Sequence, residues 1–348
     1  MIEATCHDTF ADRDYAAMAD QGILTARDGL RWPRIELSAR NYNFWSVNAQ
    51  IDAAQEAGIE VVWDLFHYGY PDDVDIFSDD FAKRLAGLAA EFAAFHIRAV
   101  GRAPIVIPIN EISFFSWIAG DVGMFYPFAL DRGRELKRSL VRGAILAAQA
   151  TKSIAPEATI ASSEPLIFVR ERPDKPYLRD AAESYRTSQF EAMDMLTGQI
   201  APELGGAPDC VDVMGFNYYP HNQWYYPDRQ MIPVGDPDYK PFRELLIEAS
   251  ARYNVPIFIS ETGTEGEQRA EWFRYVTNEA DEALRAGVDL NGICLYPIVN
   301  HPGWEDERHC HNGLWDYPDE SGQRSIYEPL ANELRRCDRD VAAAKRAN

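Results

Sequence analysis

Two glutamates stand at the ends of apolar, β-branched stretches that have the same form. Glu111 ends the stretch PIVIPINE, and Glu261 ends the stretch VPIFISE. A strand that is buried on both faces should be apolar throughout, so an acid at its last position marks either its exit to solvent or the start of chemistry. Two facing carboxyl groups are what glycoside hydrolysis requires, because one protonates the departing oxygen while the other attacks the anomeric carbon.

The elements that must position these glutamates follow an alternating pattern. Short β-branched runs alternate with longer segments whose apolar residues recur at helical spacing, which is typical of βα units around a parallel sheet. The eight predicted strands are Ile2–Cys6, Ile23–Arg31, Ile59–Phe66, Ile105–Asn110, Ala158–Ser163, Val211–Asn217, Pro256–Glu261 and Gly292–Ile298. No linker or change of composition interrupts the pattern. We therefore predict an α/β fold, a single (β/α)8 TIM barrel that forms one domain over residues 1–348.

This architecture is expected to bring the two glutamates together. In a TIM barrel the loops that follow the strands carry the active site. The fourth and seventh predicted strands end at Glu111 and Glu261 and lie roughly across the barrel from one another. A carboxyl separation of about 5 Å gives retention of anomeric configuration, whereas about 6.5 to 9.5 Å gives inversion. The residues themselves do not fix that separation.

Composition narrows the range of partners. The chain has 348 residues and a net charge of −21, which argues against nucleic acid and anionic membranes because both require basic surface. No apolar run reaches about 18 residues, and the start MIEATCHDTF lacks the pattern of a signal peptide, so the expected location is the cytoplasm. The five cysteines lack CxxC spacing, which fits reduced thiols. The expected partner is a small carbohydrate or glycoside, with no cofactor and no metal.

Several short segments resemble glycoside hydrolase family 1, the β-glucosidase-like members of a larger clan of retaining (β/α)8 glycosidases. The resemblance covers nearly the whole chain and rests on motifs of three to ten residues, in the family's order along the predicted strands. These segments are DGLRWPRIE from Asp28, DLFHYGYPDD from Asp64, INE from Ile109, VMGFNYY from Val213 and SET from Ser260. The resemblance implies a retaining β-glycosidase with Glu111 as general acid/base and Glu261 as nucleophile through a covalent glycosyl-enzyme intermediate.

The resemblance also implies roles for residues around the two glutamates. Arg31 and Tyr219 would hold Glu261 charged and oriented, Asn110 would donate to the 2-hydroxyl of the sugar, and His67 would contact other sugar hydroxyls. Asn217 belongs to the same set through the VMGFNYY segment. Three of these residues have a simpler alternative. Arg31 could pair with a neighbouring acid such as Asp28 or Glu36, His67 could be a hydrogen-bonded core histidine, and Tyr219 could serve in packing alone.

The last predicted strand departs from the family pattern. Tyr296-Pro297 stands where the family has Trp-Ser with a cis peptide, and because cis is far less costly before proline, we predict a cis bond there. Aligned through Trp304, the sugar-binding glutamate of the family becomes Gly303. The nearest substitutes are Glu305, Asp306 and His301. A preference for glucose is therefore in doubt, because a pocket without that acceptor should select sugars differently.

Aromatic residues are frequent in the segments after the predicted strands, and such rings can stack on the apolar faces of sugars. We single out Trp117 and Trp304 for this role; the alternative is a hydrophobic lid packed over the barrel mouth. Three rival functions remain. The sequence HCH at His309–His311 could bind a metal, although adjacent side chains diverge. The chain could also be a carbohydrate-binding or sensory barrel without catalysis, or a transglycosidase.

Overall fold

The parallel strands of the computed structural model form one continuous twisted sheet. The structure describes residues 2–304, 306 and 308–347. Hydrogen bonding runs in the order β1-β4-β5-β6 in one half and β13-β12-β9-β7 in the other. Isolated bridges Ala161↔Val213 and Asn110↔Ser163 join the two halves. The strands are β1 (Thr25–Gly29), β4 (Glu60–Asp64), β5 (Ile105–Ile107), β6 (Thr159–Ile160), β7 (Glu164–Pro165), β9 (Met214–Asn217), β12 (Ile257–Thr262) and β13 (Leu290–Leu295).

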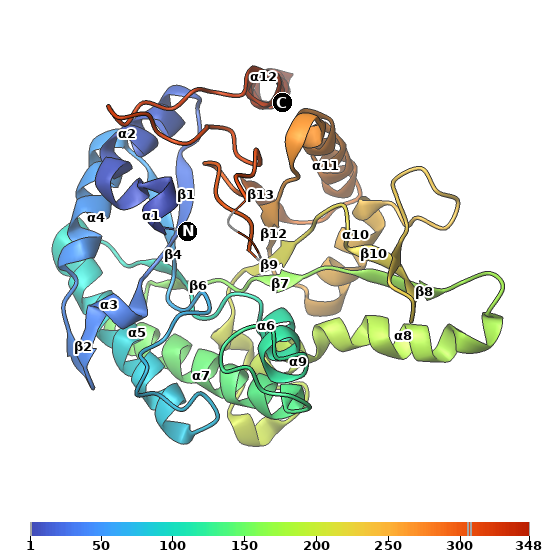
Figure 1. Ribbon diagram of the computed structural model, residues 1–348, viewed down its shortest axis with the longest axis horizontal. Coiled ribbons are helices and arrows are strands. Elements are labelled where there is room, and N and C mark those ends of the chain that lie inside the picture. Colours follow the sequence, from blue (N-terminus) through green and yellow to red (C-terminus); the bar gives the residue numbers. More distant parts are fainter. Residues whose placement is uncertain (1, 305, 307, 348) are drawn as a thin grey trace.

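Helices surround this sheet (Figure 1), and their order confirms the predicted TIM-barrel class. Helix α5 illustrates the local signals, because acids occupy its first turn, Arg98 its last turn, and Gly101 at φ +80° its C-cap. The helices are α1 (Ile2–Thr5), α2 (His7–Asp20), α3 (Trp32–Ile35), α4 (Trp45–Ala57), α5 (Asp79–Val100), α6 (Ile112–Gly120), α7 (Gly133–Ile154), α8 (Arg179–Thr187), α9 (Glu191–Leu196), α10 (Phe242–Tyr253), α11 (Arg269–Arg285) and α12 (Glu328–Ala347).

Two small sheets extend this frame. Strands β2 (Glu36–Ser38) and β3 (Asn41–Tyr42) form a hairpin between α3 and α4. Strand β10 (Gln223–Tyr226) pairs with β8 (Phe168–Glu171) on one side and with β11 (Gln230–Met231) on the other. Together with α8 these strands form an extension at one side of the barrel (Figure 1). Within the described residues, no helix has the length and apolarity required to cross a membrane.

Seven of the eight predicted strands coincide with observed parallel strands or bridges, and the first is wrong. Residues Ile2–Thr5 are helix α1, not a strand. A run this short cannot be assigned from its apolar content alone, and Glu3 and Ala4 within it both favour helix. As a result, the first strand of the sheet is β1, and it lies at an edge.

The edge of β1 and the edge of β13 are connected by side chains and loops. The described residues contain no strand ladder between these two strands. In Figure 1 the orange-red segments 296–304 and 308–327 run between them. From this segment, the Arg324 guanidinium donates to both oxygens of Asp14 on α2, at 2.6 and 3.0 Å. His7 then links Asp14, at 2.8 Å, to Asp28 on β1, at 3.1 Å.

Candidate active site

Glu111 lies where the chain turns from the sheet into helix α6. Its backbone is left-handed, with φ 46° and ψ 62°, and its N–H donates to the Ser163 carbonyl at 2.8 Å. This conformation directs the next residues into α6 directly after the strand end. The carboxyl accepts hydrogen bonds from Asn217 Nδ2 at 2.9 Å and from the Tyr68 hydroxyl at 2.9 Å. Glu111 is thus held by groups from three parts of the chain.

Burial, followed by the charge of Glu261, raises the pKa of Glu111 from 4.5 to about 8. The hydrogen bonds from Asn217 and Tyr68 act in the opposite direction. The rise caused by burial and by Glu261 exceeds the decrease caused by these two hydrogen bonds. Glu111 therefore keeps its proton at neutral pH, which is the state that a general acid requires.

Glu261 has a different environment. It lies on β12 and is 6% exposed. One carboxyl oxygen accepts a hydrogen bond from Arg27 Nη1 at 2.7 Å, and the other accepts one from the Tyr219 hydroxyl at 2.7 Å. A guanidinium and a hydroxyl that both donate to one carboxyl stabilise negative charge on its oxygens. The expected contact between Tyr219 and Glu261 is present.

The arginine beside Glu261 is Arg27, and the prediction that Arg31 holds this carboxyl is wrong. Because β1 ends at Gly29, Arg27 lies within the strand, whereas Arg31 lies beyond it at the N-cap of α3. Arg31 forms an ion pair with Asp8, which differs from the two acids considered as alternatives. Side chains alternate between the faces of a strand, so a site side chain could have been sought at even spacing before Gly29.

Arg27 also connects Glu261 to two further residues. It makes a bidentate ion pair with Asp64, with Nε to Oδ1 at 2.9 Å and Nη2 to Oδ2 at 2.8 Å. Its Nη2 donates to Asn110 Oδ1 at 2.6 Å. Burial alone would lower the pKa of Arg27, but Asp64 and Glu261 raise it above its ordinary value. The guanidinium therefore stays charged.

The amide of Asn110 fixes the proton on His67. Since Asn110 Oδ1 faces an arginine that can only donate, its Nδ2 must be the group that contacts Tyr68 Oη at 3.0 Å and His67 Nε2 at 3.2 Å. His67 Nε2 therefore accepts, and Nδ1 carries the hydrogen that is donated to Asp64 at 2.8 Å. Both ring nitrogens of His67 and both amide hydrogens of Asn110 have protein partners. A hydrogen bond that either residue donates to a sugar hydroxyl would have to replace one of these bonds.

Asn217 and Tyr296 also lie at this site. Asn217 is fully buried, and its Oδ1 accepts from Ser163 Oγ at 3.0 Å and from Ser260 Oγ at 2.6 Å, which orients its Nδ2 toward Glu111. Burial, followed by the charge of Glu261, raises the pKa of Tyr296 above its ordinary value, so its phenol stays protonated. The Tyr296-Pro297 peptide is cis, as predicted.

The two tryptophans differ in their relation to the site. Trp304 is half exposed, stacks on Phe125 with ring centroids 6.0 Å apart, and lies 6.2 Å from the ring of Tyr68, which donates to Glu111. Trp117 instead packs on Phe114, and the Arg229 guanidinium lies over its ring. Trp304 is thus a direct ring neighbour of Tyr68, whereas Trp117 is connected to Tyr68 through Phe114.

The carboxylate of Asp306 lies beside Gly303, the position that the family resemblance aligns with a sugar-binding glutamate. A Cβ atom added at Gly303 would collide with the Asp306 carboxylate, so that side chain fills the space beside the glycine. Glu305, which was expected to contribute here, lies outside the described residues. Within the described part of the chain, no three His, Cys, Asp or Glu side chains gather in a way that could hold a metal.

Sequence reasoning missed Arg27, Asp64, Tyr68 and the buried Glu164. Asp64 is the last residue of β4, so it has the same signal as Glu111 and Glu261, an acid that ends an apolar strand. Tyr68 lies in a segment that was quoted for His67 alone, and its φ of +72° could not be read from the sequence. Glu164 falls one residue after the predicted fifth strand.

Comparison with solved structures identifies close structural neighbours of low sequence identity. A family 1 β-glucosidase from Thermotoga maritima superposes with a TM-score of 0.77 at 15% identity, over 94% of this chain and 86% of the other. The AHE enzyme from Alicyclobacillus herbarius superposes with a TM-score of 0.76 at 18% identity, over 97% and 87%. The Thermotoga enzyme has also been solved with glucoimidazole. No protein-family model and no curated protein matches the sequence. At such identity, these similarities establish the fold, a TIM barrel like that of the family 1 β-glucosidases.

Proposed function

We propose that this protein is a retaining β-glycoside hydrolase, with Glu111 as general acid/base and Glu261 as nucleophile. The observation that carries the proposal is the contrast between two neighbouring carboxyls at the carboxyl ends of β5 and β12. Burial favours the proton on Glu111, while Arg27 and Tyr219 donate to both oxygens of Glu261. Two carboxyls in opposite environments are the arrangement by which one site performs acid and nucleophile chemistry together.

The proposed reaction has two steps. In the first, Glu261 attacks the anomeric carbon while Glu111 gives its proton to the glycosidic oxygen, so that the aglycone leaves and a glycosyl ester forms on Glu261. In the second, the ionised Glu111 takes a proton from water, whose oxygen attacks the anomeric carbon and releases Glu261. Arg27 and Tyr219 stabilise the carboxylate before attack and after release. Transfer to an acceptor other than water would use the same intermediate.

The substrate we propose is a small β-glycoside whose sugar need not be glucose. The structural similarity to β-glucosidases supports the glycosidase class. Gly303, with Asp306 beside it, supports a sugar pocket that differs from a glutamate-based one. A shorter carboxylate, or one placed differently, would accept hydroxyl hydrogens from a different part of the sugar ring.

The test is a panel of aryl β-glycosides that includes glucoside, galactoside, xyloside, fucoside and glucuronide. We expect the wild type to hydrolyse at least one member and Glu261→Ala to lose that activity, with the exposed Glu135→Ala as matched control. NMR of the anomeric proton in the first product would show retention. Inversion would refute the nucleophile, and silence across the panel together with measurable sugar binding would favour a binding barrel.

A further inference from the structure

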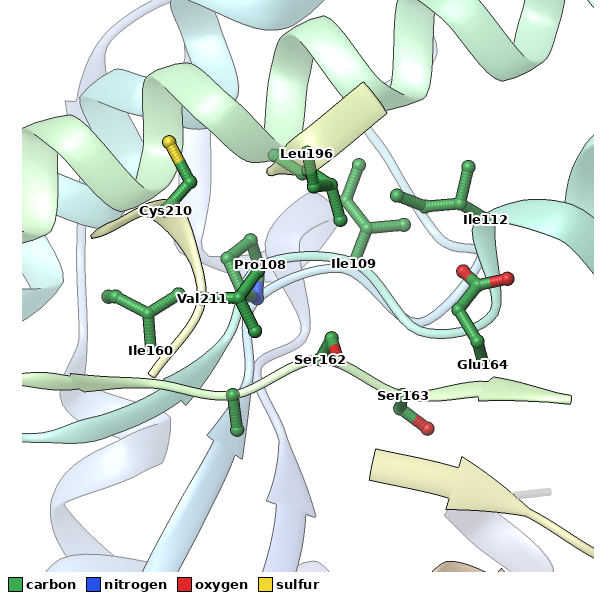
Figure 2. A pocket seen from close by; sticks show the side chains of 12 residues that line it. Pro108, Ile109, Ile112, Ile160, Ser162, Ser163, Glu164, Leu196, Cys210 and Val211 are labelled. Atoms are coloured by element: carbon green, nitrogen blue, oxygen red, sulfur yellow. The ribbon is translucent and has the colours of Figure 1, made fainter. Parts of the chain in front are cut away.

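The stretch Ser162–Glu164 lies directly behind Glu111. Its side chains alternate, so that Ser162 and Glu164 face the helices while Ser163 points to the opposite side (Figure 2). Ser163 supports Glu111 twice: its carbonyl accepts the Glu111 N–H at 2.8 Å, and its Oγ donates to Asn217, which donates to the Glu111 carboxyl. The same short stretch therefore contacts the acid on one side and helix α6 on the other.

Glu164 is a buried acid that has no place in the proposed reaction. It is 1% exposed, and one carboxyl oxygen accepts the backbone N–H of Ser113 at 3.0 Å. Ser113 lies in the first turn of α6, the helix that begins immediately after Glu111. A carboxylate at this position satisfies a free N–H of the helix and interacts favourably with its dipole. Glu164 thus fixes the turn that sets the backbone of Glu111.

The second oxygen of Glu164 is buried and has no hydrogen-bond partner among the described residues. Ser162 Oγ is in the same state. Both residues line a small cavity between the sheet and the helices, with room for about one water molecule (Figure 2). Burying a carboxylate costs free energy, and the cost is larger when only one of its oxygens has a hydrogen-bond partner. An uncharged side chain would therefore serve better as a purely structural cap of helix α6.

We propose that Glu164 is a positioning residue for Glu111: it holds the first turn of α6, and its negative charge favours the protonated form of the acid. The proposal rests on the proposed function, in which Glu111 must donate a proton. Glu164 touches neither substrate nor reacting atoms in this scheme and acts only through Glu111.

The groups around Glu164 determine when its carboxyl becomes negatively charged. Burial raises the pKa of Glu164 to about 7 in spite of the hydrogen bonding by Ser113 and the charge of Lys137 on α7, which act in the opposite direction. Lys137 is itself paired with Glu191 at 2.8 Å. Cys210, which lines the cavity, has its thiol pKa raised by burial and stays neutral. An ionised Glu164 places a negative charge near Glu111 and raises the pKa of Glu111.

The negative charge of an ionised Glu164 opposes the loss of the proton from Glu111. The pKa of Glu111 is raised by burial, then by Glu261, and also by Glu164. Tyr68 opposes the rise by its hydrogen bond. Tyr219 and Tyr296 face the same centre with raised phenol pKa values and remain neutral.

Two substitutions separate the effect of the Glu164 charge from the effect of its hydrogen bond with the Ser113 N–H. Glu164→Gln removes the charge but leaves an oxygen for the Ser113 N–H, and Glu164→Ala removes both. Ser162→Ala, in the same cavity, is the matched control, because the Ser162 hydroxyl makes no hydrogen bond to the described residues of α6. The readouts are the ¹³C NMR titration of the Glu111 carboxyl, assigned by its absence in Glu111→Gln, and the pH profile of kcat/KM on the best aryl glycoside.

In Glu164→Gln we expect the Glu111 titration and the alkaline limb of the profile to move together to lower pH, with kcat/KM in the acidic range near that of wild type. Glu164→Ala should in addition lose kcat/KM at every pH, and Ser162→Ala should show neither change. An unmoved Glu111 titration in Glu164→Gln would overturn the proposal, because a structural role affects stability alone. The NMR titration requires no turnover, so a failure of the proposed glycosidase activity would be distinguished from a failure of this inference.

Discussion

Replacing Glu111 by glutamine should make the protein more stable at alkaline pH. The folded state raises the pKa of Glu111 from 4.5 to about 8, so the folded protein keeps a proton that the unfolded chain has lost. Below pH 4.5 both states are protonated and the group contributes nothing. Between pH 4.5 and about 8 stability falls as pH rises, and above this range the full penalty of a buried charge applies.

The size of the effect follows from the pKa difference. A rise of about 3.5 pH units corresponds to an upper bound of about 5 kcal/mol. Glu111 is partly exposed, and solvent screening reduces this bound, so we expect roughly 2 to 4 kcal/mol. Glu111→Gln is uncharged at every pH and should gain this stability relative to wild type at about pH 9, with little difference at about pH 4.5.

The assay is urea denaturation of both proteins at a series of pH values between about 4.5 and about 9, with free energies of unfolding compared at each pH. Taking the difference between the two proteins cancels the contribution of Glu164, which has the same sign. Glu135→Gln, an exposed acid paired with Arg132, serves as control and should not show the alkaline gain. A difference between Glu111→Gln and wild type that stays constant with pH would refute the view that Glu111 is held protonated.

Three further predictions concern activity. Glu111→Gln should lower turnover by about 10² to 10⁴ for glycosides with poor leaving groups and far less for dinitrophenyl glycosides, measured as kcat/KM across a leaving-group series; equal losses would remove the proton donor from the scheme. Arg27→Gln should lower kcat/KM by at least about 10², whereas Arg31→Gln should leave it near wild type, and the reverse result would contradict the assignment of the Glu261 partner. Tyr219→Phe, which loses one donor to Glu261, should lower kcat by about 10-fold or more without changing the far-UV circular dichroism spectrum; unchanged kcat would assign this tyrosine to packing.

The sequence was informative where a chemical signal coincided with a strand end. Glu111 and Glu261 each follow an apolar run, and both lie at or just after the carboxyl end of a strand, as predicted. The assignment of Arg31 failed because it followed the resemblance of the segment DGLRWPRIE to the arginine segment of the family. In the structure β1 ends at Gly29, so Arg31 lies beyond the strand and Arg27 lies within it. Strand boundaries depend on hydrogen bonds to neighbouring strands, and these are not encoded locally.

Other features depend on contacts between distant parts of the chain. The hydrogen bond from Asn217 to Glu111 joins residues that lie 106 positions apart, and no local pattern predicts it. The orientation of the Asn110 amide, and with it the tautomer of His67, follows only once Arg27 is known to face its oxygen. Helix α1 was missed because the identity of a short segment is decided by what it packs against.

The connection from Arg324 through Asp14 and His7 to Asp28 has a consequence for the order in which the site can be assembled. Arg324 and Asp14 are 310 positions apart, so this set of ion pairs forms only after residue 324 has been synthesised. Asp28 is the strand neighbour of Arg27, and these ion pairs hold the strand that delivers the guanidinium to Glu261. A nascent chain that ended before residue 324 would contain both glutamates yet lack this support of β1, so we expect the carboxyl pair to reach its final arrangement only after residue 324 has joined the fold.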